Sequence, residues 1–238
     1  MPRDTLTQEQ IVRTAVRLLD EEGLEGLNMR SLGKRLGAAA TAVYWHVKNK
    51  DDLVLLAADR VWQEVELPPL DPEDWRSTAT AMAGRLREML LRHPWLVQAI
   101  SSHLLWGAGK ARYDDHLLGV FETAGFTAQE ADRAAGAVVT YVLGNALGAS
   151  AAACLTRRFR RAGEDPEERF RETLAEASGA AEAFPRLRAR LGTGAATEYA
   201  GAPDGSYAEG LRALLAGLRP AGGGTASGTS RPAPGAVR

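Results

Sequence analysis

The chain has 238 residues and a formal net charge of -1, so its total charge does not point to a nucleic-acid partner. Its 45% hydrophobic content allows one large core or two smaller ones, and its single cysteine excludes an intrachain disulfide framework and a multi-cysteine metal cluster. No hydrophobic signal region opens the sequence and no apolar run approaches the length of a membrane span, which predicts a cytoplasmic protein without a membrane partner.

Apolar residues recur at helical spacing along most of the chain, and strand signals are scarce, which predicts an all-α fold. Cap residues and glycines set the expected helix ends. Four helices are predicted first. One is capped by Thr7 and ended by Gly23, the second is capped by Asn28 and ended by Gly37, and the third spans about Ala40 to Val47. The fourth is capped by Asn49 and ended by the Pro68–Pro69 pair.

The proline pair marks a predicted domain boundary, and a second group of helices follows it. Asp71 as a cap and Pro72 in the first turn predict a helix that runs to Arg92 and is broken at His93–Pro94. After a short helix, the later helices are expected at about 111–124, 128–161, 166–178, 185–191 and 206–218. Gly, Ala and Pro dominate the last residues, which predicts a disordered tail.

The segment from 28 to 50 is the most informative part of the sequence, because its charge has one sign. It contains no Asp or Glu, and its cations are Arg30, Lys34, Arg35, Lys48 and Lys50. Within it, a helix ended by glycine, a short second helix, an aromatic pair and a newly capped helix follow one another. This arrangement predicts a helix-turn-helix that enters the major groove of double-stranded DNA.

The exposed side of this unit supplies the predicted DNA contacts. They are Arg30, Ala40, Thr41, Tyr44, Trp45, His46, Lys48 and Lys50. Tyr44 and His46 can hydrogen-bond phosphates or bases, and Thr41 or Ala42 can touch a thymine methyl. Lys50 adds charge at a helix N-terminus. The alternative is that Tyr44 and Trp45 are half-buried core aromatics, with Trp45 packed inward, beside a solvated lysine edge.

A second set of residues, beyond the proline pair, combines aromatic rings with a few polar tips, as pockets for apolar organic ligands do. The predicted ligand contacts are Trp95, Ile100, His103, Leu104, Trp106, Tyr141 and Asn145. The alternative for the three large aromatics is that they only fill a core. His93–Pro94 is interpreted as a helix junction rather than a metal site.

Several stretches of the sequence resemble the tetracycline-repressor (TetR) family of regulators. The strongest is YWHVKNK at 44–50, and the others are RHPWL at 92–96, GFTAQEA at 125–131, YVLGNAL at 141–147 and SYAEGLRALLAGL at 206–218. The likeness covers about 5–219. It implies an all-helical homodimer with a four-helix interface between late helices. It also implies two recognition helices on a palindromic operator, and release when a small organic effector binds.

Two departures from the family pattern bear on specificity. Ala40 and Ala42 stand where polar base-reading residues are usual, so base readout is expected to rest on Arg30, Thr41 and Tyr44. Tetracycline-responsive members hold a magnesium–drug chelate with a His and a Glu. His103 lies near the expected His, but Gly148 stands at the Glu position, so we expect no magnesium site and no cofactor here.

Together these features predict a ligand-responsive repressor with three segments. Residues 1–66 are the helix-turn-helix DNA-binding domain, 67–219 the helical ligand-binding and dimerisation domain, and 220–238 the disordered tail. No catalytic spacing of His, Asp or Ser occurs and no phosphate-binding loop follows a strand, so we expect no enzyme and no catalytic residues. The alternative is a helical dimer that binds a small molecule or a protein without gene control.

Overall fold

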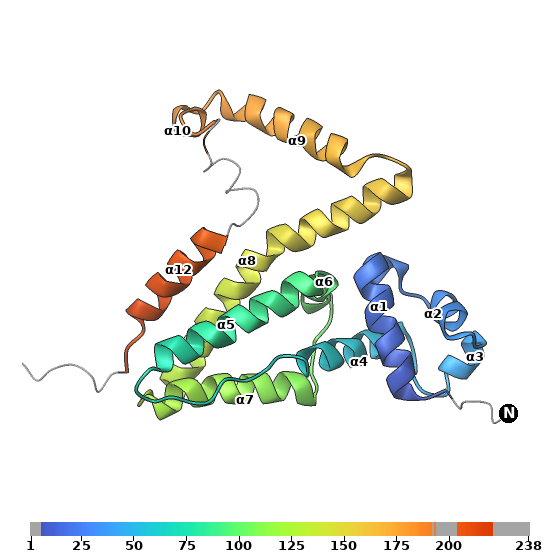
Figure 1. Cartoon of the computed structure of the whole chain (residues 1–238), viewed down its shortest axis with the longest axis horizontal. Helices are drawn as coiled ribbons and strands as arrows, with labels where there is room; N and C mark the ends of the chain where they lie inside the picture. Colours follow the sequence, from blue (N-terminus) through green and yellow to red (C-terminus); the bar gives the residue numbers. More distant parts are fainter. Residues whose placement is uncertain (1–5, 192, 194–203, 221–238) are drawn as a thin grey trace, which may run out of the picture.

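The computed structural model describes residues 6–191, 193 and 204–220, which form helices and no strand (Figure 1). The predicted all-α class is confirmed. The helices are α1 Gln8–Gly26, α2 Met29–Leu36, α3 Ala40–Val43, α4 Lys50–Trp62, α5 Trp75–Arg92, α6 Trp95–Ser102, α7 Ala108–Thr123, α8 Ala128–Ala162, α9 Pro166–Ala181, α10 Pro185–Arg188 and α12 Asp204–Gly217.

Local capping accounts for the ends of most of these helices. The Asn28 side chain accepts a hydrogen bond from the Ser31 amide at 2.8 Å, and the Asn49 side chain accepts one from the Asp52 amide at 2.7 Å. At the end of α2, Gly37 takes a left-handed backbone with φ 62°, which favours glycine. The predicted caps of α2 and α4 are therefore confirmed.

Several predicted helix ends were wrong. α4 ends at Trp62 rather than at the Pro68–Pro69 pair, because the chain turns at 63–64 and leaves helical geometry there. Gly23 does not end α1: it forms a kink with φ 69°, and the chain resumes helical geometry up to Gly26. α3 stops at Val43 rather than Val47, because residues 44–46 form a turn in which the His46 amide bonds to the Val43 carbonyl at 2.9 Å. α5 begins at Trp75 with Asp74 as its cap, not at 71.

Helices α1 to α4 pack at one end of the molecule, where α2 and α3 form its edge, and α5 to α8 form the larger helical body (Figure 1). The buried side chains of both parts belong to one continuous cluster. Val61, Val65 and Trp75 carry that cluster across the predicted boundary at 66. The division into domains 1–66 and 67–219 therefore stays a prediction, and 221–238 of the predicted tail lie outside the described residues.

α8 overturns the expectation that no apolar run approaches the length of a membrane span. By length and composition this helix could cross a bilayer, and 22% of its most apolar window is buried within the chain. The reason is the segment 134–156 of this helix, which contains no Asp, Glu, Lys or Arg and is rich in Ala, Val and Leu. One face of α8 packs on α5, α6 and α7, as core helices of globular proteins do.

Two buried tyrosines predict an alkaline loss of stability. Burial raises the pKa of Tyr113 and raises the pKa of Tyr207 to about 12, from an ordinary value of 10.0. Their neutral forms therefore stabilise the fold fully below pH 10, and this contribution is lost as the pH rises through the folded-state pKa values. We expect urea unfolding midpoints to fall between about pH 10 and pH 12.

The matched variant is Tyr207→Phe, because the Tyr207 hydroxyl is buried and has no hydrogen-bond partner among the described residues. This substitution removes a titrating group without removing a native hydrogen bond. Its urea midpoint is expected to fall less steeply with pH than that of the natural chain. Identical slopes for the two proteins would contradict the assignment.

Candidate nucleic-acid interface and ligand cavity

The α2–turn–α3 unit is anchored from beneath by apolar side chains. Leu32 of α2, Val43 at the end of α3 and Val47 after the turn are buried in the core. The side-chain amide of Gln8, at the start of α1, donates a hydrogen bond to the His46 carbonyl at 3.2 Å and holds the turn against α1. These contacts fix one side of the unit and leave its other side open.

The aromatic pair lies on the open side. Tyr44 is 54% exposed and Trp45 is 88% exposed, so the alternative in which Trp45 packs inward is wrong. Thr41 is exposed and His46 is half-buried. The side chain of Ala40 lies outside the described ones, although its backbone begins α3.

The five cations of the 28–50 segment differ in their surroundings. Arg30, Lys34 and Lys48 are exposed, and none of them forms an ion pair within the described part of the chain. Arg35 instead lies 2.6 Å from Glu21 and 2.9 Å from Glu22 of α1, and its hydrogen bond to Glu21 raises the pKa of its guanidinium.

Lys50 is exposed at the first position of α4, but its Nζ donates to the Leu24 carbonyl at 2.7 Å. This bond ties the start of α4 to the end of α1 and leaves two ammonium hydrogens for another acceptor. Six of the predicted DNA contacts are thus exposed, and His46 is half-buried. Their contacts with DNA stay a prediction.

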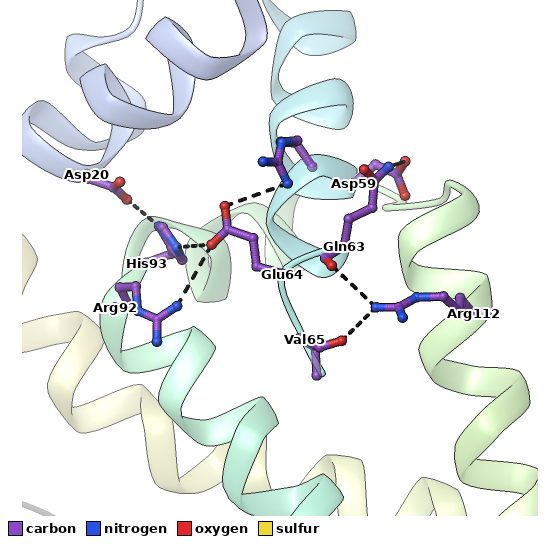
Figure 2. Close-up of polar contacts among 9 residues, drawn as sticks. Asp20, Asp59, Gln63, Glu64, Val65, Arg92, His93 and Arg112 are labelled. Atoms are coloured by element: carbon purple, nitrogen blue, oxygen red, sulfur yellow. Dashed lines mark hydrogen bonds and ion pairs between the residues drawn. The ribbon is translucent and has the colours of Figure 1, made fainter. Parts of the chain in front are cut away.

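The end of α4 is connected to its neighbours by a cluster of charged and aromatic residues (Figure 2). His93, which is buried at the α5–α6 junction, lies 2.6 Å through Nδ1 from Asp20 of α1, and Trp95 Nε1 donates to the same carboxylate oxygen at 2.8 Å. Glu64 follows α4 and lies 3.5 Å from His93 Nε2 and 3.8 Å from Arg92. His93 is therefore a helix junction, as predicted, that also joins α1 to α5.

A mostly apolar cavity of about 170 Å³ opens between α4, α5, α6, α7 and α8. Its lining residues are Trp62, Leu86, Ile100, His103, Leu104, Leu105, Lys110, Asp114, Val139 and Leu143. The structure thus brings together three predicted ligand contacts, Ile100, His103 and Leu104. His103 Nε2 also lies 3.4 Å from Asp51, in the first turn of α4, and so connects the cavity wall to the start of α4.

The other four predicted ligand contacts do not line this cavity. Trp95 is fully buried and donates its indole N–H to Asp20, and Trp106 is 70% exposed. The Tyr141 hydroxyl donates to the Tyr207 carbonyl at 2.9 Å, and the Asn145 side chain accepts a hydrogen bond from Arg87 at 2.9 Å. Trp95, Tyr141 and Asn145 therefore make structural contacts within the fold.

Sequence reasoning missed Trp62, Lys110 and Asp114. Lys110 and Asp114 form an ion pair one helical turn apart, a spacing visible in the sequence but common on solvated helix faces. Trp62 packs on Tyr113 with ring centroids 5.1 Å apart, and it has no local signal for a cavity. A larger cavity of about 290 Å³ is lined by three glutamates, two arginines and two apolar residues, between α4 and α5.

Two family profiles match the chain over most of its length. One described as bacterial regulatory proteins, tetR family, matches residues 11–57. Another described as tetracyclin repressor-like, C-terminal domain, matches residues 67–221. The tetracycline repressor protein class C of Escherichia coli is 31% identical over 215 residues, which are 90% of this chain and 90% of that protein.

Two actinobacterial relatives are more similar over shorter stretches. An HTH-type transcriptional regulator of Saccharopolyspora erythraea is 41% identical over 140 residues, which are 59% of this chain and 59% of that protein. The HTH-type transcriptional repressor DrrR1 of Streptomyces coeruleorubidus is 35% identical over 146 residues, or 61% of this chain and 54% of that repressor. The chain thus spans somewhat more than half the length of these two relatives.

The solved structures agree with the sequence relatives. The Streptomyces coelicolor TetR family protein ActR, in complex with actinorhodin, superposes with a TM-score of 0.68 at 28% identity, covering 91% of this chain and 96% of ActR. Another possible TetR family regulator from the same organism superposes with a TM-score of 0.71 at 30% identity and covers 89% of this chain.

Proposed function

The chain belongs to the TetR family of bacterial regulatory proteins, and from that membership we propose that it is a ligand-responsive repressor. As a homodimer it binds a palindromic operator, and it leaves the operator when a small organic effector fills its cavity. It acts in the cytoplasm, without a cofactor or an enzymatic step. We keep 1–66 as its DNA-binding domain and 67–219 as its ligand-binding and dimerisation domain.

The observation that carries this proposal is the open surface around Tyr44 and Trp45. Two large aromatic side chains in water cost free energy in an isolated protein, and they are typical of binding surfaces. Arg30, Lys34 and Lys48 of the same 28–50 segment are exposed, and no acid of the described residues pairs with them. Such a surface is complementary to base edges flanked by phosphates.

The exposed apolar side chains of α8 and α9 support the homodimer. Leu147 of α8 is 59% exposed, Leu174 of α9 is 54% exposed, and α9 buries no residue within the chain. A second copy would cover these faces and, with its α8, complete the four-helix interface. The dimer would then present two recognition units to successive major grooves, about 34–36 Å apart.

The 170 Å³ cavity supports a largely apolar effector with a polar group directed at Lys110, Asp114 or His103. Its relative ActR has been solved with the organic compound actinorhodin. A magnesium–drug chelate does not fit, because Asp114 is the one carboxylate of the wall and is already paired with Lys110. The 290 Å³ cavity has a charged lining and suits an apolar effector less well.

Selection of operators from random double-stranded DNA tests the proposal. The chain is expected to enrich a palindrome with half-sites one helical turn apart, with binding that weakens as salt rises. Salt-sensitive binding without any enriched sequence would exclude an operator-specific repressor. No DNA binding at all would favour the alternative, a helical dimer that binds a small molecule or a protein.

Lys50→Ala is expected to weaken binding to the operator and to random DNA by the same factor, because a lysine contributes charge at a phosphate rather than base readout. The slope of log operator affinity against log salt concentration should also become less steep, by the amount expected for about one lost phosphate contact per half-site. Fluorescence anisotropy titrations over a salt series measure both effects. Arg212→Ala, at an exposed ion pair on α12, is the control and should leave the slope unchanged.

A further inference from the structure

The N-terminus of α7 has no cap of its own. Gly107 stands at the cap position, no side chain of the segment bonds the first-turn amides, and the first turn contains no acid. Asp59 of α4 takes this role: its Oδ1 accepts hydrogen bonds from the Gly109 amide at 2.7 Å and from the Lys110 amide at 3.4 Å. A carboxylate at this end of a helix also stabilises the positive end of the helix dipole.

The C-terminal end of α4 is completed in return by α7. Arg112 donates to the Val65 carbonyl at 2.6 Å and to the Gln63 carbonyl at 3.3 Å, beyond the last turn of α4 (Figure 2). A cation is favourable at this end, where carbonyl groups lack partners within the helix. α4 therefore satisfies free amides at the start of α7, and α7 satisfies carbonyls at and just beyond the end of α4.

The two helix ends approach each other closely enough that side chains do not fit between them. Gly107 has φ 153°, and a Cβ there would lie 2.2 Å from Asp59 Oδ1. A Cβ on Gly109 would lie 2.5 Å from the Asp59 carbonyl oxygen. Glycine at both positions allows the backbone of α7 to rest directly on α4. We call these paired contacts of Asp59 and Arg112 the reciprocal caps.

The reciprocal caps lie beside the cavity. Trp62 of α4 and Lys110 of α7 both line it, and the Lys110 ammonium lies 5.6 Å from the Trp62 ring centroid. At its other end α4 begins with Lys50, about 20 Å away for a helix of this length. A rigid helix therefore connects the cavity wall to the DNA-binding surface.

We propose that Asp59 and Arg112 are positioning residues, which act through α4 to hold the recognition unit in its DNA-binding arrangement. They touch neither DNA nor effector. Because they join α4 to α7, a displacement of α7 at the cavity moves the helix-turn-helix with it. This inference rests on the proposed repressor function.

The test compares Asp59→Ala, Asp59→Asn, Arg112→Met and the Asp59→Ala/Arg112→Met double variant of the full chain. The probe is the operator selected by the natural chain, and each variant is titrated with this operator and with random DNA. Asparagine accepts amide hydrogen bonds as well as aspartate does at a helix N-terminus, so Asp59→Asn is the conservative rescue. Arg212→Met, on α12, removes an exposed ion pair elsewhere.

Asp59→Ala and Arg112→Met are each expected to weaken operator affinity about tenfold, the effect of one lost cap in both subunits. Affinity for random DNA should stay unchanged, because the exposed cations remain. Asp59→Asn should remain near the natural value, and the double variant should lose less than the product of the single losses. Thermal unfolding of each variant separates this effect from a loss of folding.

Operator affinities of Asp59→Ala and Arg112→Met equal to that of Arg212→Met would overturn the inference and leave the repressor function standing. The same holds if Asp59→Asn binds as weakly as Asp59→Ala. If Asp59→Ala does not fold, Arg112→Met, an exposed residue, decides the matter by the same comparison. If the natural chain selects no operator, the proposed function fails first and this inference fails with it.

Discussion

Replacing Trp95 by alanine is expected to destabilise the protein by roughly 3–5 kcal/mol, the usual cost of removing a large buried aromatic. Trp95 is fully buried in α6, and its indole N–H donates to Asp20 of α1. The substitution would leave a void and remove a donor to the Asp20 carboxylate, which would keep His93 as its other donor among the described residues. The loss would therefore also weaken the contact between α1 and α6.

Urea denaturation followed by circular dichroism measures this effect. The matched control is Trp106→Ala, because Trp106 is the same residue type but 70% exposed. Its removal is expected to change the free energy of unfolding by less than about 0.5 kcal/mol. Similar denaturation midpoints for the two variants would contradict the assignment of Trp95 to the core and would restore it as a candidate ligand contact.

Tyr44→Ala is expected to weaken operator binding by about 100-fold, because one contact worth about 1–3 kcal/mol is lost at both half-sites. The Tyr44 side chain is 54% exposed and makes no hydrogen bond with the described residues, so the dimer and its thermal stability should persist. Gel-shift titration measures the affinity, and analytical ultracentrifugation measures the dimer.

Tyr44→Phe separates the two parts of this side chain. If the hydroxyl contacts a base or phosphate, the Phe variant should lose most of the same affinity, whereas a ring contact alone would preserve it. Full affinity in the Ala variant would remove Tyr44 from the interface. DNA binding by this surface would then depend on Trp45 and the exposed cations without Tyr44.

Most of the fold could be predicted because its helix ends depend on neighbours three or four residues away. Asn28, Asn49 and the pair Thr127 and Glu130 cap helices within their own segments, so their signals are contained in short stretches of sequence. The cap that Asp59 provides to α7 joins residues 50 positions apart. No local pattern carries that information.

The candidate sites, too, were predicted where they depend on local sequence and missed where they depend on how helices pack. Exposure of the aromatic pair followed from a motif, whereas the pairing of Arg35 with Glu21 and Glu22 depends on how α1 packs against α2. Ile100, His103 and Leu104 were predicted as ligand contacts because apolar side chains occur there beside a polar one, and they line the cavity together. Trp62 and Lys110 reach the same cavity from other helices, and only the packing of α4 on α7 places them there.

The exposure of Trp45 gives the molecule an optical reporter at the surface in question. Of its five indoles, Trp62, Trp75 and Trp95 are shielded from solvent, and only Trp45 and Trp106 are open to a water-soluble quencher. In a Trp106→Phe background, the collisional quenching of emission would come from a single ring beside the recognition turn. Binding at that surface can then be followed by intrinsic tryptophan fluorescence, without labelling the protein or the duplex.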